Sequence, residues 1–252
     1  MSMNLLSFPQ QFSLKFVMGK RLKFLTFLIL LATVARADDT NAPATSSPSP
    51  AGKVLAPSND VGLGSDGTIK DADSYQVRIG ELYAPGGEAY IIPIRLPALP
   101  DGQQFKTVHL RAQLIGIAND ANVSPLANAD LYGLGVRDNS KAIPADYYQG
   151  PHPDPKATLI QANFLTPTSK VRTDQNTGPF VETSSDADVA LAKFLNDAYA
   201  KGAKAGQYVI LRISYDADPI PSGNNGYQLL TTGATGDEEP PIFTYTVEPV
   251  SK

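Results

Sequence analysis

Residues 89–118, AYIIPIRLPALPDGQQFKTVHLRAQLIGIA, decide the fold of this chain. Asp101-Gly102 is typical of tight turns and divides the stretch into two arms. In the second arm apolar residues alternate with polar ones, namely Val108, Leu110, Ala112 and Leu114 with Thr107, His109, Arg111 and Gln113. This period of two indicates a half-buried strand. The first arm is apolar on both faces, and Pro93 removes a ladder donor, which favours a place near an edge or a bulge. We therefore expect two long strands that face each other across a turn.

Further strands are expected at residues 74–83, 129–137, 207–215, 226–232 and 242–248, which lie between turn-forming segments. Prolines interrupt residues 139–176, so we expect a long loop there that runs over the sheet. Consecutive strands joined by turns and loops predict an all-β protein, an antiparallel jelly-roll β-sandwich with one short helix.

The helix is expected to begin at Ser185, as its N-cap, with Asp188 as the return partner of a capping box. Gly202 or Gly206 should end it. Residues at helical spacing form its apolar face, namely Leu191, Leu195, Ala198 and Tyr199.

The N-terminal residues have the pattern of an export signal. Basic residues at positions 20, 21 and 23 precede the apolar run at residues 24–34. Ala35-Arg36-Ala37 then places small residues at the two positions that signal peptidase recognises. A membrane anchor is the alternative, but the run is shorter than the roughly 20 residues that a transmembrane helix needs. We expect residues 1–37 to be a signal peptide with an N-terminal extension, translated from Met1, Met3 or Met18, and no membrane attachment after its removal.

The rest of the chain divides into two parts. Residues 38–57 are rich in Ala, Pro, Ser and Thr and are expected to be a disordered linker. Residues 58–252 are expected to form the β-sandwich domain. The expected location is secreted, either periplasmic or extracellular.

Composition limits the function classes. A chain of 252 residues, 42% of them hydrophobic, can bury one sizeable core. The net charge of -4 argues against a nucleic-acid-binding protein, which needs basic residues to meet phosphate. The absence of cysteine excludes a disulfide framework, a thiolate zinc site and a cysteine nucleophile. Nothing in the sequence indicates an oligomeric state.

Three segments resemble a known family. They are IPIRLPALPDGQQFKTVHLRAQLIGI at residues 92–117, VALAKFLNDAYAKGAKAGQYVILRISYDA at residues 189–217 and PPIFTYTV at residues 240–247. Their order of strands, turns and helix is similar to that of secreted bacterial jelly-roll domains of the carbohydrate-binding-module type, the DNRLRE-like group. The resemblance spans about residues 72–247. It implies a non-catalytic β-sandwich that is secreted beside, or attached to, polysaccharide-degrading enzymes.

Strand alternation suggests one candidate binding surface. If the strands concerned are neighbours in one sheet, polar side chains line its open face, namely Arg95, His109, Arg111, Gln113, Tyr208, Arg212 and Ser214. Guanidinium groups bind carboxylates and sulfates in bidentate fashion, so this face would suit an acidic polysaccharide. The alternative is that these are simply the solvated outer positions of strands.

Acidic loops are a second candidate, for a structural calcium ion: Asp66 with Asp71 and Asp73, Asp216 with Asp218, and residues 237–239. No other cofactor is expected. His109 and His152 lie far apart, without the spacing of a zinc site.

A tyrosine-rich group is a third candidate, comprising Tyr147, Tyr148 and His152 with Tyr132 and Tyr227. It could stack on sugar rings, but we favour the reading that it packs the loop onto the sheet.

We predict a secreted, non-catalytic module that binds an extracellular polysaccharide. The alternative is a structural or adhesive surface protein that acts through protein–protein contacts. A polysaccharide lyase or hydrolase on the same fold is a third hypothesis, although no spacing of carboxylates singles out a catalytic pair.

Overall fold

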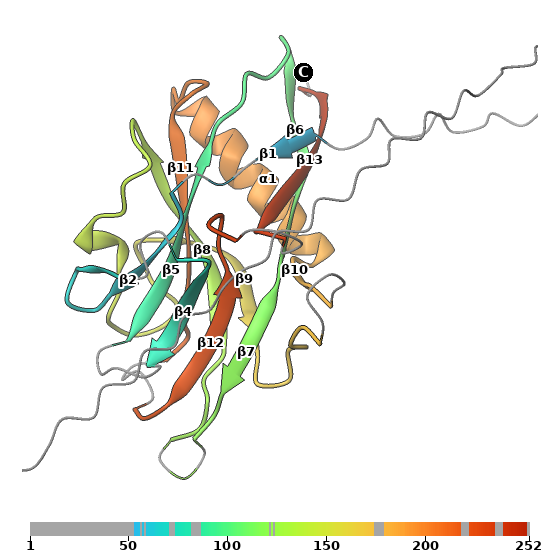
Figure 1. Cartoon of the computed structure of the whole chain (residues 1–252). Coiled ribbons are helices and arrows are strands. Elements are labelled where there is room, and N and C mark those ends of the chain that lie inside the picture. The colour runs from blue at the N-terminus through green and yellow to red at the C-terminus, as the bar shows by residue number, and fades with distance from the viewer. Residues whose placement is uncertain are drawn as a thin grey trace, which may run out of the picture. The chain divides into compact units, whose positions relative to one another are not determined.

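The computed structural model describes residues 53–55, 57, 59–70, 74–81, 87–120, 122, 124–173, 179–217, 222–234 and 239–250. They belong to one compact unit, Pro48–Lys252 (Figure 1). The expected signal peptide and the expected linker before residue 53 lie outside the described residues. Among the described residues, no helix has the length and apolar character needed to cross a membrane.

Strands dominate the described residues. They are β1 (Lys53–Leu55), β2 (Val61–Gly64), β3 (Ile69–Lys70), β4 (Gln76–Glu81), β5 (Glu88–Arg95), β6 (Gln103–Ala112), β7 (Leu114–Ala118), β8 (Ala129–Arg137), β9 (Thr158–Leu165), β10 (Val181–Glu182), β11 (Tyr208–Tyr215), β12 (Asn225–Leu230) and β13 (Ile242–Pro249). The α-helix is α1 (Ser185–Ala200), and η1 (Pro144–Asp146) is a single 3₁₀ turn.

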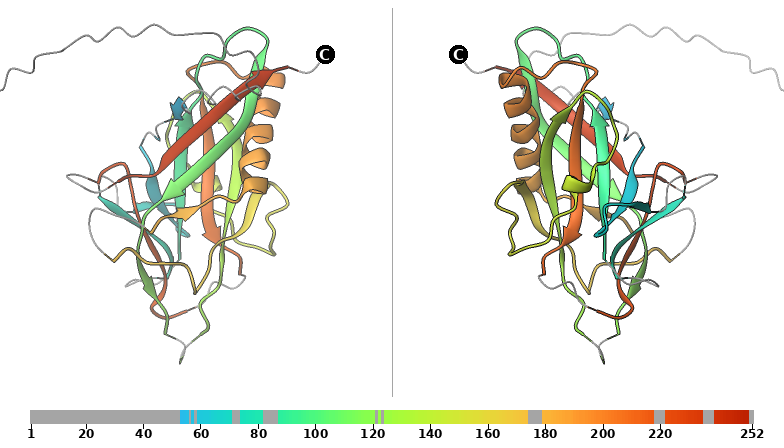
Figure 2. Two further views of the ribbon diagram at one scale, coloured as in Figure 1. Left: turned by 90° about the vertical axis from the view of Figure 1, so that its right-hand side faces the viewer. Right: turned by 90° about the vertical axis from the view of Figure 1, so that its left-hand side faces the viewer.

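The strands form two antiparallel sheets. The four-stranded sheet has the order β1-β13-β6-β10. The nine-stranded sheet has the order β7-β12-β4-β5-β11-β8-β9, with β2 paired to β5 and β3 paired to β2. Figure 2 shows β6 and β13 crossing the strands of the larger sheet, with α1 alongside. The predicted fold class, an antiparallel β-sandwich with one helix, is confirmed.

The two arms of residues 89–118 do not pair as neighbouring strands. Strand β5 pairs with β11, β2 and β4 in the larger sheet, whereas β6 pairs with β13 and β10 in the smaller one. The chain therefore crosses from one sheet to the other at residues 96–102. It crosses back at Gln113, so the second arm is not one strand but two, β6 in the smaller sheet and β7 in the larger one. Pro93 is paired with Ile210 of β11, but on its other side the pairing with β2 stops at Ile91. Strand β5 is nevertheless an inner strand, between β4 and β11, and Ile94 is bridged to Pro57 on that side, so the expected place near an edge is not found.

The main core lies between the two sheets and α1. It contains Tyr90, Ile92 and Ile94 from β5 and Val108 and Leu110 from β6, each fully buried. The period of two in both arms therefore predicted which residues fill the core. Burial of this kind is the main favourable term in folding, at roughly 25 cal/mol per Å² of apolar surface.

Helix α1 begins one residue earlier than predicted. Ser184, not Ser185, is the N-cap, and its hydroxyl oxygen accepts a hydrogen bond from the Ala187 backbone N–H at 3.2 Å. Asp188 does not complete a capping box, because its carboxylate contacts His109 of β6 at 3.0 Å. The buried face is as predicted, and Gly202, at a φ of 97°, follows the C-cap Lys201.

Five strands were not predicted. Strand β9 lies within the segment expected to be a loop, and its burial does not alternate because its register with β8 shifts twice. β2, β3 and β10 have four residues or fewer. β1 occupies the end of the expected linker and pairs with β13, and Leu55 is only 4% exposed. The folded part therefore begins before residue 58.

A second, smaller apolar cluster lies on the outer face of the larger sheet. Leu63, Ala89, Ile91 and Ile210 form it, and Tyr147 packs against it. Strand β5 is thus buried on both faces, which explains why its sequence is apolar almost throughout. We call residues 138–157, which carry Tyr147 and join β8 to β9, the covering loop.

Candidate functional site

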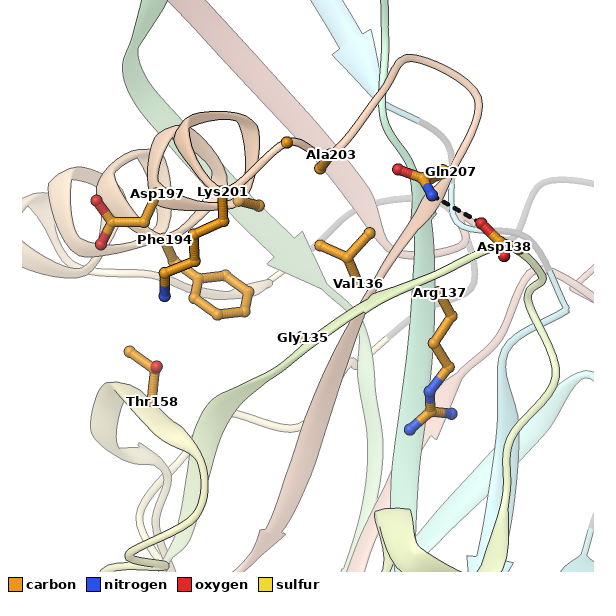
Figure 3. Close-up of a pocket in the computed structure, with 12 residues that line it drawn as sticks. Gly135, Val136, Arg137, Asp138, Thr158, Phe194, Asp197, Lys201, Ala203 and Gln207 are labelled. Atoms are coloured by element: carbon orange, nitrogen blue, oxygen red, sulfur yellow. Dashed lines mark hydrogen bonds between the residues drawn. The ribbon is translucent and has the colours of Figure 1, made fainter.

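A cleft lies between the end of α1 and the last residues of β8 (Figure 3). Its volume is about 490 Å³, within the range of small-molecule sites. The pairing of β9 with β8 stops at Gly133, opposite Thr158, so residues 134–137 of β8 run past the end of β9. The C-terminal half of α1 and the residues after it form the opposite wall. The lining residues are Gly135, Val136, Arg137, Asp138, Thr158, Phe194, Asp197, Ala198, Lys201, Gly202, Ala203 and Gln207.

Two glycines of β8 shape this cleft. A Cβ at Gly133 would lie 2.4 Å from the Phe194 ring, so glycine is required for the helix to approach. Gly135 has a φ of 127°, and nothing lies within 4 Å of the place where its Cβ would be. The register with β11 shifts here, as in a β-bulge. Together the two glycines seat the Phe194 ring and leave open space beside it.

Two of the four charged side chains in the cleft, Asp197 and Arg137, are paired with an opposite charge, and a third, Asp138, accepts a hydrogen bond from a neutral amide. The Asp197 carboxylate accepts a hydrogen bond from the Lys193 ammonium at 2.5 Å, and Asp138 accepts one from the Gln207 amide at 2.7 Å. Arg137 forms an ion pair with the buried carboxylate of Asp146. The Lys201 ammonium is exposed and has no ion-pair partner among the described residues. In Figure 3 its side chain extends from the end of the helix past the Phe194 ring, on the side of the ring away from Gly135 and Val136.

Among the predicted binding residues that lie on different strands, Arg95 and Tyr208 are brought together. They are directly opposite each other on β5 and β11, and Arg137 of β8 is opposite Tyr208 on its other side. This row lies on the outer face of the larger sheet, with Arg95 exposed. Arg137, the third member, was not predicted.

His109 and Arg111 lie in the other sheet, on β6. His109 faces α1, where its Nδ1 lies 3.0 Å from Asp188. Arg111 donates to Glu239 at 2.6 Å and stacks over the Phe180 ring, with its carbon Cζ 4.6 Å from the ring centre. The expected single face of guanidinium groups is therefore not formed, because its strands belong to two sheets.

Gln113 and Arg212 are buried, which also contradicts an open face. Gln113 is 0% exposed, and its side-chain oxygen accepts a hydrogen bond from Arg172 at 3.1 Å. Arg212 is 1% exposed and donates to the Asp154 carboxylate at 2.8 Å and to the Asp146 backbone carbonyl at 3.0 Å. Arg212 thus anchors the covering loop instead of meeting solvent.

Its neighbour on the strand supports the same role. Ser214 of β11, which was also predicted to lie on the open face, is buried and accepts a hydrogen bond from Arg212 Nε at 3.1 Å.

The tyrosine-rich loop packs onto the sheet. Tyr148 and Tyr132 lie on either side of the Arg212 guanidinium, with ring centres 5.6 Å and 4.9 Å from its Cζ. Burial raises the pKa of Tyr147 to about 12, since the charged phenolate would lose its hydration. The packing interpretation of these aromatic residues is therefore confirmed for Tyr132, Tyr147 and Tyr148.

The acidic loops expected to hold calcium are only partly described. Asp66 accepts hydrogen bonds from the Thr68 hydroxyl and the Lys70 ammonium within the β2–β3 turn. Glu239 is paired with Arg111. Asp71, Asp73, Asp218, Asp237 and Glu238 lie outside the described residues.

The cleft was missed because its residues come from three separate parts of the chain. One signal was nevertheless present, because Gly133 and Gly135 alternate within a strand, which often marks a close approach or a bulge. No protein-family model matches the chain, and no curated protein matches it. What the fold establishes is a mostly-β protein with two antiparallel sheets and one helix.

Proposed function

We propose that this protein is a secreted, non-catalytic module of the jelly-roll carbohydrate-binding type, and that it binds a polysaccharide bearing carboxylate groups in the cleft between α1 and β8. One observation carries the proposal: the cleft, open over Gly135, is also lined by an aromatic ring, Phe194, and by Lys201, whose ammonium has no ion pair among the described residues. An apolar surface with a few directed polar groups is the usual make-up of a small-ligand site. The expected signal peptide supports the location.

The charges of the cleft favour an acidic sugar. The Asp197 carboxylate is paired with the Lys193 ammonium, and the Asp138 carboxylate is held in place by the Gln207 amide. Lys201 is then the cation available to a ligand carboxylate, and a lysine ammonium attracts such a group as a point charge.

The edge of β8 is a poor site for a partner strand. Only residues 134–137 extend past β9, and the bulge at Gly135 interrupts the extended backbone there. Short, bulged edges resist strand addition from another protein. At this cleft, the geometry therefore favours a polysaccharide over a strand of another protein.

The test is affinity electrophoresis of the protein in gels that contain alginate, polygalacturonate or neutral glucans, at low and high salt. We expect an acidic gel to retard the protein at low salt. Lys201→Gln should weaken this retardation, and Val136→Glu, which places a carboxylate in the cleft at a position already 36% exposed, should abolish it.

Lys106→Gln is the matched control, because it removes the same charge from an exposed position on β6 of the other sheet. Equal loss in Lys201→Gln and Lys106→Gln would mean that net charge alone is responsible. Absence of retardation by every polysaccharide would overturn the proposal, and release of shortened chains would show catalysis.

A further inference from the structure

A second group of polar side chains lies on the outer face of the larger sheet, and none of them lines the cleft. Asp130 of β8, His152 of the covering loop and Asp216, which directly follows β11, each offer one ligand atom within 4.8 Å of the other two. Asp130 is directly opposite Ser214 in the sheet, and Asp216 lies two residues beyond Ser214. The two carboxylates therefore project from the same face, beneath the covering loop.

The Asp130 carboxylate is fixed in place by its neighbours. It is 2% exposed, and its Oδ1 accepts a hydrogen bond from the Asn163 backbone N–H at 2.7 Å. Its Oδ2 accepts one from the Tyr132 hydroxyl at 3.0 Å. A buried carboxylate in this setting calls for a positive partner.

The His152 side chain is largely buried, and one of its nitrogens, which lies near these acids, has no hydrogen bond. Its side chain is only 10% exposed, and Nδ1 has no hydrogen bond although it lies 3.4 Å from Asp216 Oδ1. The ring is held edge-on against Tyr148, with ring centres 5.8 Å apart. Unsatisfied buried nitrogens are uncommon in folded proteins, so this one requires an explanation.

We propose that Asp130, His152 and Asp216 bind a divalent transition-metal cation, with Zn²⁺ as the ion that suits them best. One imidazole nitrogen and two carboxylates form a mixed nitrogen and oxygen set, which zinc accepts. Calcium takes six to eight oxygen ligands and would leave the imidazole unused. Three protein ligands leave a coordination position for water, and Asp216, 36% exposed, lies on the solvent side.

The contacts around the ligands resemble those that orient metal ligands elsewhere. Hydrogen bonds to a ligating carboxylate hold it in one direction and tune its affinity, as Asn163 and Tyr132 do for Asp130. The bound ion would tie the covering loop to the ends of β8 and β11. Sequence spacing cannot reveal such a site, because its ligands come from three distant segments.

The experiment is titration of the chelator-treated protein, purified without a histidine tag, with ZnCl₂, and with CaCl₂ and MgCl₂ for comparison. Calorimetry should give one Zn²⁺ per chain and no comparable signal for the other two ions. The chain has only two histidines, so long-range ¹H–¹⁵N spectra resolve both imidazoles. We expect Zn²⁺ to shift the His152 signals and to leave those of His109 unchanged.

Variants make the test specific. His152→Gln and Asp216→Asn should each weaken Zn²⁺ binding at least about tenfold. His109→Gln is the matched control, because His109 also lies beside a carboxylate, that of Asp188, and should bind Zn²⁺ normally. Equal affinity in wild type and His152→Gln would overturn the proposal. So would a His152 imidazolium whose signals do not respond to Zn²⁺, since a proton would then take the place of the metal.

Discussion

Leu211 and Arg212 are consecutive residues of β11, both are buried, and they lie on opposite faces of the larger sheet. Leu211 packs in the main core between the sheets, among other apolar side chains. Arg212 lies under the covering loop, where an ion pair, two further hydrogen bonds and two aromatic rings surround it. The buried layer on the inner face is thus stabilised by the packing of apolar side chains. The buried layer around Arg212 on the outer face is stabilised by specific polar partners.

This difference determines which substitutions on each face should destabilise the protein. An apolar core tolerates substitutions that conserve volume, since no single pair of groups determines its energy. A buried ion pair depends on both partners, because removal of one leaves an uncompensated charge. The four predictions that follow, together with the glycan and zinc experiments, test this contrast in order of expected effect.

Arg212→Met should destabilise the protein by about 3–5 kcal/mol, because Asp154 would remain buried without its counter-charge. Asp154→Asn keeps the Oδ1 acceptor for the Lys156 backbone N–H. It should also destabilise the protein, because Arg212 would remain buried without its counter-charge. The double variant should lose less than the sum of the two single variants. Urea unfolding curves of the four proteins measure this coupling, and strict additivity would contradict a coupled outer layer.

Leu211→Ala should cost about 2–5 kcal/mol through lost apolar burial and the cavity left behind. Leu211→Met, with nearly the same volume, should cost less than about 1.5 kcal/mol. Combined with Asp154→Asn, Leu211→Ala should be additive, since the two side chains lie on opposite faces. Urea unfolding again gives the values, and strong coupling would show that the two faces are not independent.

Ser184→Ala should cost about 0.5–2 kcal/mol, because the Ala187 backbone N–H would lose its cap at the start of α1. Ser185→Ala is the matched control, since Ser185 is exposed and already inside the helix. Thermal unfolding compares the two variants. A larger effect for Ser185→Ala would instead support the N-cap predicted from the sequence.

The smallest effect is expected at Asp66, in the exposed β2–β3 turn. Hydrogen bonds from the Thr68 hydroxyl and backbone, with the Lys70 ammonium, hold the pKa of this carboxyl well below its usual range. A lowered folded-state pKa stabilises the protein above the unfolded value of about 4, and this stabilisation is lost as the pH falls toward the lowered pKa. The melting-temperature difference between wild type and Asp66→Asn should therefore shrink in acid. A difference independent of pH would contradict the role of the charge.

The sequence predicted correctly those features that depend on the pattern within a single strand. The alternation of Val108, Leu110 and Ala112 shows which side is inside, whatever the strand pairs with. The same alternation placed Arg212 outside the core correctly, but it could not show that the covering loop buries that side. The partners of Arg212 lie 58 and 66 residues away in the chain. For the same reason neither the cleft nor the group around His152 could be found from spacing.

The pairing of β13 with β1 and β6 has a consequence for how the chain folds. Tyr245 of β13 is opposite Lys53 and Val108. The smaller sheet therefore cannot form its middle until β13, which follows β6 by about 130 residues, has been positioned. Such distant pairing implies high contact order and slow folding, on the scale of milliseconds to seconds. Until β13 is in place, the edges of β1 and β6 are open to other chains. A chain shortened before Ile242 should therefore aggregate rather than fold into a smaller sandwich.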